Sequence, residues 1–254
     1  MLKSVEKNDT DFLSFCDKDV FGTRIKAYYN CYSTGFDFVK FWVQYDENGK
    51  ITAAVSRVDG DATVCADNAD TEEIKEFLNI VGFRTVQCEE TVAKQLTDKS
   101  FDWGYVVRIE KSGNYREAQI KKHFEYKEIY DIIKPENLTG VGDYLPWLSD
   151  TTYRVNRNAA EGRIAVIDGE NAGCAMVLFR TDKAALLGAV ATKPEYRGKG
   201  VARSLVLSLA EEEIKQGRRT ELLCKNGSIV EFYKSIGFTV VNKWGLIKNE
   251  AEFL

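Results

Sequence analysis

Alternating apolar and polar positions in the first half of the chain predict short strands joined by tight turns. The turns are rich in Asp, Asn and Gly, which favour hairpins. Between the later strands, residues 71–80 carry apolar positions at helical spacing and acids in the first turn, which indicates a helix. The predicted elements are strands at 38–45, 51–58 and 62–66, a helix at 71–80, a strand at 84–88, a helix at 90–97 and a strand at 104–110.

The second half repeats this order of elements. Its hairpin turns at Asp168-Gly169-Glu170-Asn171, and its long amphipathic helix is ended by Gly217. The predicted elements are a hairpin at 163–179, a strand at 184–192, a helix at 200–216, a strand at 220–224, a helix at 228–236 and a strand at 238–247.

The repeated order predicts a tandem of two copies of one α+β fold. Each copy would hold a mixed, mostly antiparallel sheet flanked by helices, with further helices before each sheet within residues 11–33 and 129–160. We place the boundary between 1–124 and 125–254, because residues 111–127 are hydrophilic and look like a seam.

Composition narrows the classes of partner. The chain has 254 residues, of which 44% are hydrophobic and 29% charged, as in globular proteins. Its 35 basic and 39 acidic residues give a net charge of −4, so a nucleic-acid partner is not expected. No apolar run approaches the roughly 18 residues of a bilayer span, and the N-terminus is charged. We therefore expect a cytoplasmic protein without a membrane partner; the sequence leaves the oligomeric state open.

Cysteine and histidine usage argues against a metal site. The six cysteines are scattered singly without a CxxC pair, and His123 is the only histidine. His123 lies among charged residues, which is typical of solvated surface rather than of a catalytic triad. We expect no metal and no histidine-based nucleophile.

The segment from Val190 to Arg203 is the most informative. A strand end is followed by a loop with Arg197-Gly198-Lys199-Gly200 and then by a helix start, where successive amides can bind a phosphate or pyrophosphate. The alternative is a strand-to-helix turn that needs glycine only for its geometry.

Two known phosphate motifs fit this segment poorly. A Walker A loop needs Ser or Thr after Gly-Lys, whereas Gly200 follows Lys199. A dinucleotide fingerprint needs a third glycine where Arg203 stands, and it begins directly after the strand, whereas five residues separate Thr192 from Gly198. Dinucleotide binding is therefore the weaker interpretation.

At these residues the sequence resembles the GNAT superfamily of acyl-CoA-dependent N-acyltransferases. The family's loop signature is matched by Arg197-Gly198-Lys199-Gly200-Val201-Ala202, after Pro194-Glu195-Tyr196. Downstream, Asn226 is followed at seven residues by Tyr233 and then by Lys234-Ser235-Ile236-Gly237-Phe238. The resemblance covers about residues 129–250. It implies a domain that uses acetyl-CoA as co-substrate and acetylates a small-molecule or peptide amine.

The resemblance also implies site residues. Backbone groups of Val190 and Thr192 would contact the pantetheine arm, and Asn226 would position that arm or the helix behind it. Tyr233 would protonate the departing thiolate, as a phenol with a usual pKa near ~10 can. Its alternative role is packing beside Phe232. The pyrophosphate would be held by the loop and helix start: Arg197, Gly198, Lys199, Gly200, Val201 and Ala202.

The expected reaction is direct attack by the amine, with the oxyanion held by a backbone N–H near Val190. The strand at 184–191 carries no carboxylate, so the base is open; Asp143, Asp150, Glu161 and a water chain are the candidates. An acyl relay through Cys174 or Cys224 is disfavoured, because both lie in apolar strands.

The first copy lacks the phosphate loop. It has Asp67-Asn68-Ala69-Asp70 where the second copy has the glycines, and these acids would repel a pyrophosphate. We expect one cofactor site per chain, with the first copy degenerate. Besides N-acetyl transfer, a non-catalytic CoA-binding sensor or adaptor and a dinucleotide-dependent enzyme stay open.

Overall fold

The computed structural model describes residues 2–136, 138, 141–225 and 227–249. The chain divides into two compact units, each made of more than one segment. Unit 1 comprises Met1–Val106, Leu223–Val230 and Val240–Leu254, whereas unit 2 comprises Val107–Leu222 and Glu231–Thr239. The boundary that we place between residues 124 and 125 follows sequence order rather than compactness, and it stays a prediction.

Unit 1 holds a mixed sheet with the strand order β1-β2-β3-β4-β5-β12. Neighbouring strands are antiparallel except for the parallel pair β4 and β5. The elements that begin in this unit are β1 (Leu2–Ser4), α1 (Thr10–Phe15), α2 (Val20–Tyr32), β2 (Val39–Tyr45), β3 (Ile51–Val58), β4 (Asp61–Ala66), α3 (Thr71–Val81), β5 (Thr85–Glu89), α4 (Glu90–Leu96), β6 (Asp102–Ile109) and α8 (Ser228–Ser235).

Local sequence explains where several of these elements start and turn. Asp59 and Gly60 have φ of 47° and 88°, the left-handed conformations that a tight hairpin turn between β3 and β4 requires. Asp70 caps α3 by accepting a hydrogen bond from the amide of Glu73 at 3.0 Å. The predicted strands and helices of residues 38–97 are confirmed, and no bound differs by more than one residue.

The last strand of the chain completes the sheet of unit 1. β12 (Thr239–Lys248) runs antiparallel to β5, from the pair Trp244 and Glu89 to the pair Lys248 and Thr85. The indole of Trp244 donates to the carbonyl oxygen of Cys224 at 3.0 Å. Ile247 belongs to the same buried cluster as Leu78, Val86 and Leu96, so β12 is part of this unit's core.

Unit 2 holds the strand order β11-β10-β9-β8-β7. Here β10 and β11 are parallel, and the other neighbours are antiparallel. The elements are β7 (Gln119–Ile120), α5 (Tyr126–Ile133), a 3₁₀ turn (Lys134–Glu136), α6 (Tyr144–Val155), β8 (Glu161–Ile167), β9 (Glu170–Arg180), β10 (Ala184–Thr192), a second 3₁₀ turn (Pro194–Tyr196), α7 (Val201–Lys215) and β11 (Arg219–Cys224).

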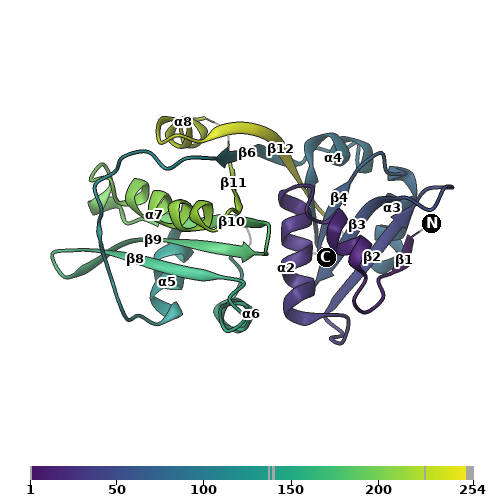
Figure 1. The fold of residues 1–254 in the computed structure, drawn as a ribbon, viewed down its shortest axis with the longest axis horizontal. Helices are drawn as coiled ribbons and strands as arrows, with labels where there is room; N and C mark the ends of the chain where they lie inside the picture. Colours follow the sequence, from purple (N-terminus) through teal and green to yellow (C-terminus); the bar gives the residue numbers. More distant parts are fainter. Residues whose placement is uncertain (1, 137, 139–140, 226, 250–254) are drawn as a thin grey trace. The chain divides into compact units, whose positions relative to one another are not determined.

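Helices α5 and α7 cover opposite faces of the strands β8 to β10 (Figure 1). Glycine permits close approach on each face. A methyl group added at Gly162 would lie 2.4 Å from Cδ1 of Ile129 in α5, and one at Gly173 would lie 2.9 Å from Cγ1 of Val201 in α7. Close packing on both faces fixes where α7 begins relative to the end of β10.

The predicted α+β class, with mostly antiparallel mixed sheets, is confirmed. Residues 111–127, which were predicted to be a hydrophilic seam, are not wholly a linker, because Gln119 and Ile120 form a short strand that pairs with β8. Among the described residues, no helix combines the length and the apolar character that crossing a membrane would need.

Candidate active site

Strand β10 is irregular close to its end. It pairs with β11 from Ala184 and Arg219 to Leu187 and Leu222. Against β9, the register passes from Gly188–Met176 to Ala191–Cys174, so Ala189 and Val190 together face a single residue. This is a β-bulge, and Ala189 has a φ of 49° within it. Bulges re-aim backbone groups beside functional sites, and this one contains Val190.

The loop after β10 leads directly into α7. Gly198 and Gly200 have φ of 76° and 79°, and a methyl group added at either would meet no atom within 4 Å. Gly200 stands at the N-cap of α7, where no side chain forms a capping hydrogen bond. Helix α7 thus begins directly after a glycine, and no side chain caps its first amides, which include those of Val201 and Ala202. An uncapped helix start with open space beside it can bind an anion.

Cationic side chains surround this helix start. Arg197 donates from Nε to the carbonyl oxygen of Thr192 at 3.1 Å and from Nη2 to Glu136 at 2.6 Å. Arg203 donates to the carbonyl oxygen of Asn114 at 3.0 Å, and Nζ of Lys199 lies 5.0 Å from the ring centroid of Tyr196. Arg197 therefore fastens the loop to the end of β10 as well as adding positive charge.

Thr192 carries a buried hydroxyl that lacks a partner. Its Oγ1 forms no hydrogen bond within the described part of the chain. A buried polar atom without a partner costs about 1–3 kcal/mol, so it calls for an explanation. The role predicted for Thr192 concerns its backbone groups rather than this hydroxyl, so that role stays a prediction.

Tyr233 lies on α8 and belongs to unit 2. Its side chain is 7% exposed, and its ring packs against Phe232 and Phe238 at centroid distances of 5.1 and 5.6 Å. The packing role is thus present, and the acid role predicted for its hydroxyl stays a prediction. Asn226 lies outside the described residues, so its predicted role also stays a prediction.

Two of the three candidate bases are held by arginines. Asp150 accepts hydrogen bonds from Nε and Nη2 of Arg154 at 3.0 and 2.7 Å. Burial alone would raise the pKa of Glu161, but hydrogen bonds and charge from Arg180 and Arg163 outweigh it and lower that pKa. The lowered pKa makes Glu161 a weaker base, and the carboxylate of Asp150 is engaged by Arg154, so neither residue gains support from the structure.

The third candidate base, Asp143, stands at the N-cap position of α6 without a side-chain capping bond.

The cysteines named for an acyl relay are protonated at neutral pH. Burial raises the pKa of Cys174 to about 12 and that of Cys224 to about 11. Because the thiolate is the nucleophilic form, these shifts argue against a relay. The Sγ of Cys174 donates to the carbonyl oxygen of Ala189 at 3.5 Å, so the thiol supports the bulge.

Sequence reasoning missed two contributors to this geometry. Ala189, an ordinary residue by type, adopts the left-handed conformation inside the bulge. Glu136 reaches Arg197 across 61 positions of sequence. Neither residue belongs to a local motif that could have identified it.

The corresponding helix start in unit 1 is closed by the chain's own side chains. Oδ1 of Asp70 accepts from the amide of Glu73, and Gln44 donates to the carbonyl oxygen of Asp70 at 2.9 Å. Lys18 lies 3.0 Å from Asp67. Capping by a carboxylate occupies the place that an anionic ligand would need, which supports the expectation of one cofactor site per chain.

Comparison with known proteins relates part of the chain to one family of domains. Residues 160–240 match the family model described as acetyltransferase (GNAT) domain. No curated protein matches the chain in sequence.

Solved structures resemble the whole chain. One is a tandem GNAT protein from the clavulanic acid biosynthesis pathway (12% identity, 97% of each chain, TM-score 0.58). Another is a GCN5-related N-acetyltransferase from Sphaerobacter thermophilus (15% identity, 97% of this chain and 94% of that one, TM-score 0.63). A third is a GNAT-family acetyltransferase from Colwellia psychrerythraea (14% identity, 98% and 100%, TM-score 0.55). These likenesses concern the fold.

Proposed function

Because the chain belongs to the GNAT superfamily and has its tandem arrangement, we propose that it transfers an acetyl group from acetyl-CoA to a primary amine. The observation that carries the proposal is the start of α7. An uncapped helix N-terminus, preceded by two glycines with open space beside them, follows a strand whose bulge re-aims backbone groups near its end. Together these features fit a ligand with an anionic end and a polar arm.

The loop, the start of α7 and the end of β10 fit successive parts of coenzyme A. Amides from Gly198 to Ala202 would bind the pyrophosphate, with positive charge from Arg197 and Lys199 beside them. Thr192 and Val190 at the end of β10 would bind the pantetheine arm. Acetyl-CoA, when bound, supplies an acyl group activated as a thioester.

The chain's own groups would then stabilise charge and move protons. A backbone N–H at the bulge near Val190 would stabilise the oxyanion as the amine attacks the acyl carbon. The hydroxyl of Tyr233 would donate its proton to the departing thiolate, because a neutral phenol is a suitable acid for that group.

The amine must lose a proton before it attacks. For an amine with a pKa near ~10.4 this costs about 4.6 kcal/mol at pH 7, at about 1.36 kcal/mol per unit. Asp150 and Glu161 are engaged by arginines, and β10 offers no carboxylate. Asp143 and solvent water are therefore the proposed acceptors. The amine itself is a small molecule or a peptide, and no nucleic acid is needed.

The non-catalytic alternative is a CoA-binding sensor or adaptor. It is favoured by one observation, the absence of Asp and Glu from β10. Tight binding of acetyl-CoA, without acetylation of any compound in a broad screen of polyamines, amino acids, aminoglycosides and peptide N-termini, would support this alternative.

The test of catalysis uses Tyr233→Phe, which removes the hydroxyl and keeps the ring packing. We expect the Kd for acetyl-CoA by calorimetry to stay within about twofold, with one site per chain, and kcat to fall by about a hundredfold or more. Unchanged turnover would remove Tyr233 from the chemistry. An affinity for NAD above that for acetyl-CoA would overturn the proposal in favour of a dinucleotide enzyme.

A further inference from the structure

The bulge in β10 is held from the neighbouring strand by one buried thiol. Cys174 on β9 is fully buried, in the cluster that α5 forms with β8, β9 and β10. Its Sγ donates to the carbonyl oxygen of Ala189 at 3.5 Å. Burial raises the pKa of this thiol to about 12, and a hydrogen bond from the backbone of Ala191 acts in the opposite sense. The thiol therefore keeps its proton at neutral pH and contacts the backbone on both sides of Val190.

The conformation of Ala189 depends on such a contact more than that of an ordinary strand residue. Its φ of 49° lies in the left-handed region, which is unfavourable for any residue with a Cβ. The described pairing of β10 with β11 ends at Leu187 and Leu222, so the ladder on that side does not fix Ala189. The thiol on the other side, from β9, is then a specific constraint on the bulge.

One peptide unit links this thiol to the proposed chemistry. The carbonyl of Ala189 and the N–H of Val190 belong to the same planar trans peptide, so they point in opposite directions. Because the carbonyl is held by Cys174, the N–H of Val190 points away from that thiol. This N–H is the donor that the proposed function assigns to the oxyanion.

We propose that Cys174 is a positioning residue for acetyl transfer, whose thiol holds the carbonyl of Ala189 and thereby aims the N–H of Val190 at the acyl oxygen. The inference rests on the proposed function. A donor that is already aimed needs no reorganisation when negative charge forms on that oxygen. The role differs from an acyl relay, because the thiol stays protonated and forms no bond to the acyl group.

Isotope-edited infrared spectroscopy of bound acetyl-CoA, carrying ¹³C at the acetyl carbonyl, tests the proposal without an acceptor amine. A hydrogen bond to this carbonyl lowers its stretching frequency, so the parent chain should lower it relative to free acetyl-CoA. Cys174→Ala should return the frequency toward the free value. Cys174→Ser keeps a donor on a shorter bond and should retain part of the shift. Calorimetry gives the concentrations that saturate each variant, so a change in affinity does not affect the comparison.

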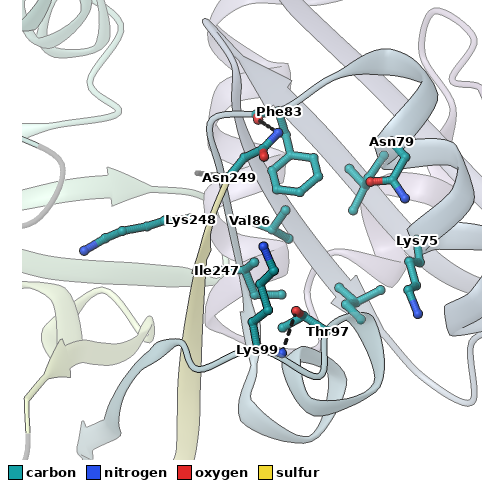
Figure 2. A pocket seen from close by; sticks show the side chains of 11 residues that line it. Lys75, Asn79, Phe83, Val86, Thr97, Lys99, Ile247, Lys248 and Asn249 are labelled. Carbon is teal, nitrogen blue, oxygen red and sulfur yellow. Dashed lines mark hydrogen bonds between the residues drawn. The ribbon is translucent and has the colours of Figure 1, made fainter. Parts of the chain in front are cut away.

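Cys88→Ala is the matched control, because it removes a sulfur atom from an equally buried place. Cys88 lies on β5 in the core cluster of unit 1, together with Val86 and Ile247, which Figure 2 shows. Both alanine variants should lose similar stability in urea unfolding. Only Cys174→Ala should change the carbonyl frequency.

The outcomes separate this inference from the proposed function. A parent chain that does not bind acetyl-CoA would overturn both. Binding with an unshifted carbonyl frequency would overturn the inference alone, and so would a shift that Cys174→Ala retains in full or that Cys88→Ala loses equally. If Cys174→Ala does not fold, the comparison of Cys174→Ser with the parent chain decides, and an identical frequency in the two would overturn the inference.

Discussion

Nε of Arg197 donates to the carbonyl oxygen of Thr192 at 3.1 Å, across the loop that separates β10 from α7. The same guanidinium reaches Glu136 at 2.6 Å. One planar side chain thus ties the last residue of a bulged strand to the loop before an uncapped helix start. The position of the proposed pyrophosphate site depends on this hydrogen bond and ion pair.

Arg197→Ala should raise the Kd for acetyl-CoA about tenfold, because both the hydrogen bond to Thr192 and the ion pair with Glu136 are lost. Arg197→Lys should rescue it poorly, since an ammonium cannot reproduce the two-sided fork. Calorimetry measures both. Lys199→Gln is the control, because it removes a nearby positive charge without touching Thr192. An equal loss in the control would show that charge, rather than the tie, carries the effect.

Gly200→Ala should weaken acetyl-CoA binding by about tenfold or more. The new Cβ costs about 1 kcal/mol at φ of 79° and projects into the open space before the first amides of α7. Gly217→Ala is a matched control: Gly217 ends the same helix, has φ of 74° and also faces open space. Both variants should lose similar stability in urea unfolding, but only Gly200→Ala should lose affinity. Similar affinities would contradict an anion site at the helix start.

Local chemistry made much of this geometry predictable. The strand at 184–192 is confirmed residue for residue, and Asp168-Gly169 turns with φ of 52° and 84° as a tight hairpin turn requires. The helix start after Gly200 was found because glycine spacing is a local signal. Alternation, helical periodicity and turn residues all act within a few positions, so sequence alone carries them.

Non-local pairing was not predictable in the same way. The pairing of β12 with β5 joins residues more than 150 positions apart, and both halves end in strands of similar pattern. Alternation states which side chains share a face, but it does not state which neighbour a strand takes. For the same reason the sequence did not show that Arg180, 19 positions away, pairs with Glu161. The pair of Asp150 and Arg154 is different, because both lie on α6 at a spacing of four residues and were open to prediction from helical periodicity.

Glu213→Gln should destabilise unit 2 strongly. Glu213 is 2% exposed and accepts hydrogen bonds from Arg180 at 2.5 and 2.9 Å and from Arg218 at 2.9 Å. Loss of its charge leaves the buried Arg180 dependent on Glu161, at 2.7 Å, for an anionic partner, so we expect a loss of about 2–4 kcal/mol in the free energy of unfolding. Urea unfolding followed by circular dichroism measures this loss.

The neighbouring residue supplies the control for that measurement. The side chain of Glu212 is 57% exposed and pairs with Arg163. Glu212→Gln should cost less than about 1 kcal/mol, because exposed ion pairs contribute little. Equal losses for the two substitutions would contradict the structural importance of the buried network.

Glu128 should make the stability of unit 2 depend on pH. Hydrogen bonds from Lys121 and Asn171 lower the pKa of its carboxyl to about 2, below the usual value near ~4.3. A lowered folded-state pKa contributes stability that is fully present above the unfolded-state pKa and is lost as pH falls toward about 2. Glu128→Gln should therefore be less stable than the parent chain at pH 7, and the difference should shrink between about pH 5 and pH 2. Urea midpoints at pH 7, 5, 4 and 3 measure the difference.

The control is Glu170→Gln, at an exposed position beside Asn171, which should show no comparable trend. A constant difference between pH 7 and pH 3 would show that Glu128 stabilises the unit by packing or neutral hydrogen bonds rather than by its charge.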